Sequence, residues 1–134
     1  MTRDEALALV KTNVAADNLV KHMLATEAVM GALARRLGED GERWRLAGLL
    51  HDLDVEKTAE TMAVHGLRTV EMLLEAGLDD ESVLQAIAAH NPANGSSVQT
   101  LMDRALFACD PLTGLVTATA LIRLEDDGSV AVVV

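Results

Sequence analysis

The chain has 134 residues, enough for one domain with a single hydrophobic core. Its net charge of −10 argues against nucleic-acid and membrane-surface binding, because both need clustered lysine and arginine side chains. The sequence has no apolar run of the roughly 18 residues a membrane span needs and no signal-peptide layout, and its one cysteine excludes an internal disulfide. We therefore expect a cytoplasmic protein.

The composition predicts an all-α fold, a single-domain bundle of about five or six helices. Half of the residues are hydrophobic, but there is one tryptophan, one phenylalanine and no tyrosine. Leucine, alanine, valine and methionine must therefore fill the core. These residues suit helices, and the chain has only two prolines to interrupt the helical periodicity.

Three helices are predicted in the first half of the chain. Thr2 and Glu5 fit a capping box for a helix that runs to Lys11. A second helix, from Asp17 or Asn18 to Leu37, has apolar residues at steps of three and four. A third follows the break at 38–41 and covers about 42–51. The segment 52–61 is polar and irregular, which predicts a loop.

The second half predicts three more helices and a different tail. A fourth helix spans about 62–76 and is closed by Gly77, and a fifth spans about 80–90 because Pro92 follows it. A sixth runs from about 98 to 109, with an extension past Pro111 to Ala120 left open. Residues 125–128 indicate a turn and 129–134 a strand without an identified partner. We divide the chain into a helical domain (1–124) and a divergent tail (125–134).

Polar residues interrupt the apolar stripes of several predicted helices. Each of the four histidines lies on such a stripe or at the end of one: His22, His51, His65 and His90. Asp52 follows His51, and Asp110 ends another apolar run. In a bundle these stripes meet in the interior, where an unpaired polar group costs about 1–3 kcal/mol.

A shared divalent ion would satisfy these groups together, and imidazole with carboxylate suits Fe, Mn, Zn, Ni or Co. The alternative is that each histidine is a surface or hydrogen-bonded core residue. Cys109 has no basic neighbour in the sequence to activate it, so we interpret it as a core residue.

The order of these residues resembles the HD superfamily of metal-dependent phosphohydrolases. The resemblance runs from His22 through the doublet in GLLHDLD to Asp110 and so covers nearly the whole chain. The segments KHMLATEAVM, RLAGLLHDLD, AHN and DPLTGL are similar to small bacterial HD-domain (HDIG-type) hydrolases of unassigned substrate. In this family the chain usually continues helically where the present sequence has its tail.

The resemblance implies a ligand set. The family's first metal would be bound by His22, His51, Asp52 and Asp110. The extra histidines of two-metal members match His65 and His90, with Asp52 bridging both ions. Two-metal members often carry a second histidine where this chain has Asn91, so one or two ions are both expected.

The resemblance also suggests catalytic and substrate-binding residues. We predict Asp52, Asp54 and Lys57 as catalytic, and Lys57 and Arg68 as contacts of the substrate phosphate. A solvated surface charge is the alternative for each cation. Asp54 is interpreted as a base or as an outer group that orients His51 or a metal-bound water, with an N-cap as the alternative.

The implied function is a hydrolase in which metal-activated water attacks a phosphate ester of a small molecule or nucleotide. Two alternatives stay open. One is a di-iron HD-type oxygenase. The other is a non-catalytic metal-binding helical module, with a homodimer formed through the C-terminal tail.

Overall fold

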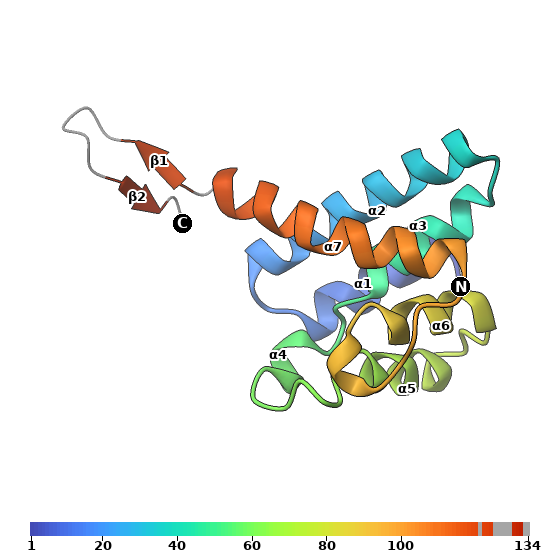
Figure 1. Ribbon diagram of the computed structural model, residues 1–134. Helices are drawn as coiled ribbons and strands as arrows, with labels where there is room; N and C mark the ends of the chain where they lie inside the picture. Colours follow the sequence, from blue (N-terminus) through green and yellow to red (C-terminus); the bar gives the residue numbers. More distant parts are fainter. Residues whose placement is uncertain (121, 125–129, 133–134) are drawn as a thin grey trace.

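The computed structural model describes residues 1–120, 122–124 and 130–132. Its helices are α1 (Arg3–Asn13), α2 (Asp17–Leu37), α3 (Gly41–Leu50), α4 (Val55–Thr58), α5 (Leu67–Glu75), α6 (Glu81–Ala89) and α7 (Leu101–Ala120), with a 3₁₀ turn at Pro92–Asn94. Two short strands follow, β1 (Ile122–Leu124) and β2 (Val130–Val132). The predicted all-α bundle is confirmed, and both described strands come after the last helix (Figure 1).

Helix α3 lies at the centre of the bundle. It packs against α1, α2 and α6, while α7 crosses both α2 and α6 (Figure 1). The predicted capping box is confirmed, because the Thr2 hydroxyl accepts from the Glu5 N–H and the Glu5 carboxylate accepts from the Thr2 N–H. Gly77 follows the end of α5 with a φ of 83°, which confirms its predicted place.

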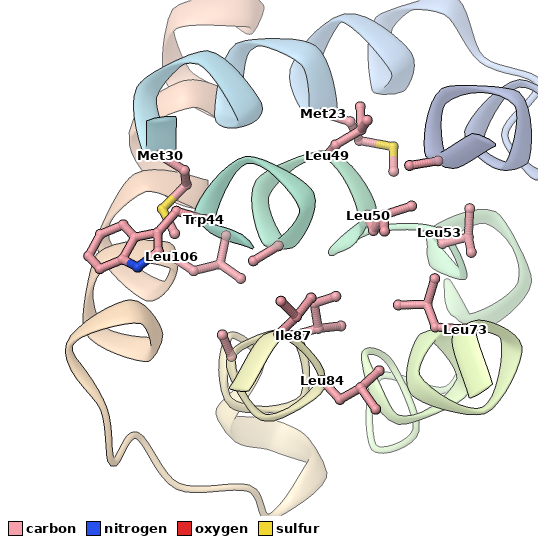
Figure 2. Packing of buried hydrophobic residues seen from close by; sticks show 14 of the residues in the cluster. Met23, Met30, Trp44, Leu49, Leu50, Leu53, Leu73, Leu84, Ile87 and Leu106 are labelled. Carbon is pink, nitrogen blue, oxygen red and sulfur yellow. The ribbon is translucent and has the colours of Figure 1, made fainter. Parts of the chain in front are cut away.

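Aliphatic side chains and Trp44 fill the core, as the composition predicted. Trp44 of α3 lies beside Met30 of α2 and Leu106 of α7 (Figure 2). Leu50 and Ile87 are both fully buried between α3 and α6. The bundle thus closes around α3, the helix whose last residue precedes the His51-Asp52 doublet.

Gly48 sets the distance between α2 and α3. A Cβ atom at this position would lie 2.8 Å from the backbone carbonyl oxygen of Thr26. Only glycine allows the two helix backbones to approach this closely. His22 lies one turn before Thr26, and His51 lies three residues after Gly48, so this contact brings the two histidines together.

Two of the predicted element boundaries are wrong. Residues 52–61 are not only a loop, because the backbone N–H groups of Lys57 and Thr58 bond to the Asp54 carbonyl and form the short helix α4. The predicted helix 62–76 begins five residues later, at Leu67. Gly66 has a φ of +84°, a left-handed conformation that a right-handed helix does not continue through. His65 therefore lies in a turn and not within a helix.

The extension of the last helix past Pro111, which the sequence left open, is present in α7. The helix continues through Pro111 to Ala120 without a break. A proline inside a helix removes one backbone hydrogen bond, and the helix accommodates that loss here. The uninterrupted helix carries Asp110 and the residues that follow it along one side of α2.

The two strands that follow α7 pair with each other. β1 and β2 are antiparallel, with Ile122 opposite Val132 and Leu124 opposite Val130. The strand partner that the sequence could not identify is thus β1, within the same chain, and the homodimer through the tail stays a prediction. The predicted turn at 125–128 lies outside the described residues. Within the described part of the chain, no helix combines the length and apolarity needed to cross a membrane.

Candidate metal centre

The first metal group consists of His22, His51, Asp52 and Asp110. His22 comes from α2, the doublet from the end of α3, and Asp110 from α7. The Nε2 atom of His22 lies 3.2 Å from Nε2 of His51, 3.1 Å from Oδ1 of Asp110 and 3.5 Å from Oδ2 of Asp52. The structure therefore brings together all four residues that the sequence predicted as ligands of one ion.

The second metal group consists of Asp52, His65 and His90. The other carboxylate oxygen of Asp52, Oδ1, lies 3.2 Å from Nε2 of His65 and 3.5 Å from Nε2 of His90. The two histidine Nε2 atoms are 3.1 Å apart. Asp52 thus directs one oxygen into each group, which is the bridging arrangement expected of a two-metal site.

The geometry of both groups fits a metal ion. Ligand atoms that each lie about 2.0–2.2 Å from one ion are roughly 3–3.6 Å from one another, which matches the separations measured here. The Nδ1 atoms of His51 and His90 face the carbonyl oxygens of Gly48 and Ile87 and donate to them, so each neutral ring keeps its lone pair on Nε2. Where two such lone pairs face each other, a proton or a metal cation must lie between them.

The carboxylates attract this positive charge strongly. Burial disfavours the charged form of His51, but the charge of Asp52 and the hydrogen bond to Asp110 outweigh burial and raise its pKa to about 10. Burial is likewise outweighed at His22, where hydrogen bonds to Asp110 and Asp52 raise the pKa to about 8. Burial also opposes ionisation of Asp52, yet His51 and the hydrogen bonds of its neighbours hold its pKa well below the usual range.

Asp54 holds His65 in place. It is fully buried, and its Oδ1 atom accepts from Nδ1 of His65 at 2.7 Å. Its Oδ2 atom accepts from the backbone N–H groups of Gly66 and Thr69. Burial opposes ionisation of Asp54, but the hydrogen bond from His65 and these N–H groups lower its pKa. The carboxylate orients a histidine, as one alternative proposed, although the histidine is His65 and not His51.

Two asparagines complete the support of His65. The side-chain amides of Asn91 and Asn94 both donate to the His65 carbonyl oxygen, at 3.0 and 2.8 Å. Gly66 brings this turn close to α6, because a Cβ atom there would lie 3.3 Å from the His90 ring. Asn94 was missed in the sequence, and its only signal was its position in the loop after AHN.

A threonine pair supports His22. The hydroxyl of Thr113 lies 2.7 Å from the Thr26 hydroxyl and 3.4 Å from Nδ1 of His22. Neither threonine was predicted. The spacing of Thr26 four residues after His22 was visible in the sequence, but Thr113 is 91 residues away from His22 and only the packing of α7 on α2 brings it there.

The other predicted site residues lie elsewhere or act differently. Lys57 is exposed and donates to the Asn13 side chain, and Arg68 is exposed and paired with Glu71. Both match the solvated-charge alternative. Asp54 does occupy the N-cap position of α4, as the N-cap alternative proposed, but its side chain makes no capping bond there. Cys109 is buried, and burial raises its pKa, in keeping with a core residue.

A cleft of about 340 Å³ opens onto the first metal group, where His22, Asp52 and Asp110 form part of its wall. The Asp110 side chain is 29% exposed, whereas that of His51 is fully buried. Solvent and small molecules therefore reach the first metal group from the side of α7. Neither Lys57 nor Arg68 lines this cleft.

Comparison with known protein families matches residues 19–115 to the HD domain. The chain belongs to the HD domain family. This confirms the resemblance on which the ligand set was predicted, and the HD domain places the protein in a superfamily of metal-dependent phosphohydrolases. The residues that hold the metal stay a prediction, supported by the proximity of their ligand atoms.

Several bacterial ribonucleases are similar to this HD domain. Ribonuclease Y of Lawsonia intracellularis is 28% identical over 108 residues, which cover 81% of this chain and 20% of that protein. Ribonuclease Y of Nitratidesulfovibrio vulgaris and Ribonuclease Y 1 of Pediococcus pentosaceus are 32% and 36% identical over 74 residues, or 55% of this chain and 14% of theirs. The chain spans about a fifth or less of the length of these relatives.

Proposed function

We propose that this HD domain hydrolyses phosphate esters of small molecules, with one or two divalent metal ions bound by the first and second metal groups. The observation that carries the proposal is the position of Asp52, whose two carboxylate oxygens each face a separate set of histidine nitrogens. A carboxylate shared by two cation sites would hold two ions close together, which is the arrangement that two-metal hydrolysis of phosphate esters uses.

Divalent ions bound here supply the chemistry of lowering the pKa of a water molecule and polarising a phosphoryl oxygen. The chain's own residues set the geometry. The Gly48 and Ile87 carbonyls fix the tautomers of His51 and His90. Asp110 stands at the open edge of the group, where a phosphate entering from the cleft arrives first. The side chains of His51 and His90 are almost completely buried and exclude water from the inner side.

RNA is the second candidate substrate, because the similar relatives are named as ribonucleases. Two observations favour a small ester instead. The net charge of −10 repels a polyanion, and no lysine or arginine among residues 1–119 lines the cleft. The paired histidine groups also suit a di-iron oxygenase, so oxygen uptake by the iron-loaded protein belongs in the same set of assays.

The proposal is tested with the Mn²⁺-loaded protein on 4-nitrophenyl phosphate, a panel of metabolite phosphates and a short RNA. Asp52→Asn removes the shared carboxylate charge, so we expect loss of tight metal binding and of all turnover. Glu71→Gln is the matched control, since it neutralises an exposed carboxylate on α5 whose one hydrogen-bond partner among the described residues is Arg68. Circular dichroism confirms that both variants fold.

Retained phosphatase activity in metal-free Asp52→Asn protein would overturn the metal-dependent mechanism. Cleavage of RNA with no turnover of small esters would favour the second candidate. Substrate-dependent oxygen uptake by the anaerobically reduced, iron-loaded protein would favour the oxygenase. Metal binding without turnover in any of these assays would favour the alternative of a non-catalytic metal-binding helical module.

A further inference from the structure

The cleft beside the first metal group has walls that are mainly apolar. Apart from His22, Asp52 and Asp110, it is lined by Asn18, Leu19, Pro111, Gly114, Thr117 and Ala118. These residues come from the start of α2 and the second half of α7. Its volume of about 340 Å³ lies at the lower end of the roughly 300–1,000 Å³ of small-molecule sites.

The polar groups of these walls are few. Thr117 already donates its hydroxyl to the carbonyl oxygen of Thr113 at 2.9 Å. Asn18 is then the one lining side chain outside the metal group with an amide to offer a ligand. A sugar or a nucleobase carries several polar groups, and placed here it would regain few of the hydrogen bonds that it loses to water, which is unfavourable.

The charges and rings of the cleft wall also disfavour nucleotides. No cation from residues 1–119 lines the cleft, while Asp52 and Asp110 bring negative charge to one end of it. Additional phosphates, as in nucleoside di- and triphosphates, would meet no positive side chain there. Among residues 1–119, no tryptophan, tyrosine or phenylalanine lines the cleft, and its one aromatic ring, that of His22, belongs to the first metal group.

We infer that this cleft holds the organic part of the substrate and selects phosphate esters of apolar, uncharged alcohols over nucleotides and sugar phosphates, with Leu19 as a specificity-determining residue. The inference rests on the proposed function for the position of the phosphate, at the metal groups. Leu19 is partly exposed and stands at the start of α2, where its side chain forms one apolar wall of the cleft.

The test is an alkyl series that changes only the organic group. Binding of methyl-, butyl- and hexylphosphonate to the Mn²⁺-loaded full chain is measured by calorimetry, and turnover of the corresponding alkyl phosphates by phosphate release. Each buried methylene is worth about a fourfold gain in affinity, so we expect butylphosphonate to bind at least about tenfold more tightly than methylphosphonate.

Two variants at one position separate packing from polarity. Leu19→Gln keeps the length of the side chain but makes the wall polar, and we expect it to remove most of the preference for butyl over methyl. Leu19→Met keeps volume and apolar character and should retain the preference. Thermal unfolding of both variants shows whether the fold is preserved, and the butyl-to-methyl ratio is independent of the amount of active protein.

The outcomes distinguish the inference from the proposed function. Equal affinity and turnover across the series, or an unchanged ratio in Leu19→Gln, would overturn the assignment of the cleft while leaving phosphate hydrolysis intact. Chain-length-dependent phosphonate binding without turnover of any phosphate would support the cleft and count against the proposed hydrolysis. Faster turnover of nucleoside triphosphates than of butyl phosphate would also overturn the inference.

Discussion

The two metal groups meet at Asp52, but different parts of the fold position them. Helix packing positions the first group, because His22 and Asp110 lie inside the long helices α2 and α7 and the doublet follows α3. Hydrogen bonds position the second, because His65 lies in a turn held by Asp54 and the asparagines. The first group has four candidate ligands and the second has three. We therefore expect the first to bind metal more tightly.

The largest expected effect comes from deleting one histidine of each group. His51→Gln removes a fully buried ligand of the first group, and we expect loss of tight metal binding and of activity. His90→Gln removes a ligand of the second group alone, and we expect one tightly bound ion to remain. In each variant, the affinity for the affected ion should fall by more than the roughly 10–100-fold typical of losing a residue that bonds to a metal ligand but not to the metal. Metal analysis after gel filtration measures the metal that each variant retains. Equal loss of bound metal in the two variants would contradict the expectation that the first group binds metal more tightly.

Asp54→Asn tests the dependence of the second group on its hydrogen bonds. The variant weakens the contact with Nδ1 of His65 and removes a negative charge. We expect affinity for the second ion to fall about 10–100-fold while the first ion is retained. Calorimetric titration with Mn²⁺ resolves the two steps. An equal weakening of both would show that Asp54 supports the whole fold and not His65 alone.

Gly48→Ala tests the dependence of the first group on helix packing. The new Cβ atom would lie 2.8 Å from the Thr26 carbonyl oxygen, so α2 and α3 must separate. We expect the free energy of unfolding to fall by about 1–3 kcal/mol, with weaker binding at the first group. Gly41→Ala, on the same helix, is the control because its Cβ atom meets nothing within 4 Å. Urea denaturation that shows equal stability for both variants would contradict this role.

The smallest effect concerns the start of α7, the helix that carries Asp110. Burial opposes ionisation of Asp103, but the Thr100 hydroxyl and the N–H groups of Gln99 and Thr100 hold its pKa below the ordinary value. A lowered pKa stabilises the fold above the unfolded-state pKa, near pH 4, and this contribution is lost as the pH falls through the folded-state pKa.

Asp103→Asn should therefore lower the free energy of unfolding by about 1 kcal/mol at pH 7, because a neutral amide oxygen accepts weaker hydrogen bonds than a carboxylate. The difference from the wild-type protein should shrink as the pH falls from about 4, where Asp103 is protonated in the unfolded chain, through its lower folded-state pKa. Urea denaturation of the metal-free proteins at pH 7 and below about pH 4 measures this difference in stability. A difference independent of pH would assign the effect to packing and not to charge.

The sequence predicted the first group better than the second for a physical reason. Periodicity places His22 and His51 on apolar stripes, and such stripes face each other in a bundle. The left-handed turn at Gly66 and the partners of Asp54 depend on contacts between separate segments, which periodicity does not describe. The order and spacing of the six candidate ligand residues could be read from the sequence, and the match to the HD domain confirms the family that this order indicated.

Lys57 and Arg68 show the limit of the resemblance. Both were chosen for their distance along the chain from the doublet or from His65. Arg68 was placed on a helical face with His65, but His65 precedes α5 and Gly66 intervenes. Lys57 lies on α4, whose existence was not predicted, and its amine bonds to Asn13. The number of residues between a cation and a candidate ligand does not determine where the cation's side chain points when the backbone between the two changes conformation.

The most direct test of the central claim, that Asp52 joins two metal groups, is an electron paramagnetic resonance titration of the metal-free protein with Mn²⁺. We predict an isolated-ion signal up to one equivalent. Between one and two equivalents, this signal should be replaced by that of an exchange-coupled pair. In His90→Gln the isolated-ion signal should persist. Two equivalents of bound but uncoupled Mn²⁺, or saturation at one equivalent in the wild-type protein, would contradict the shared-carboxylate account.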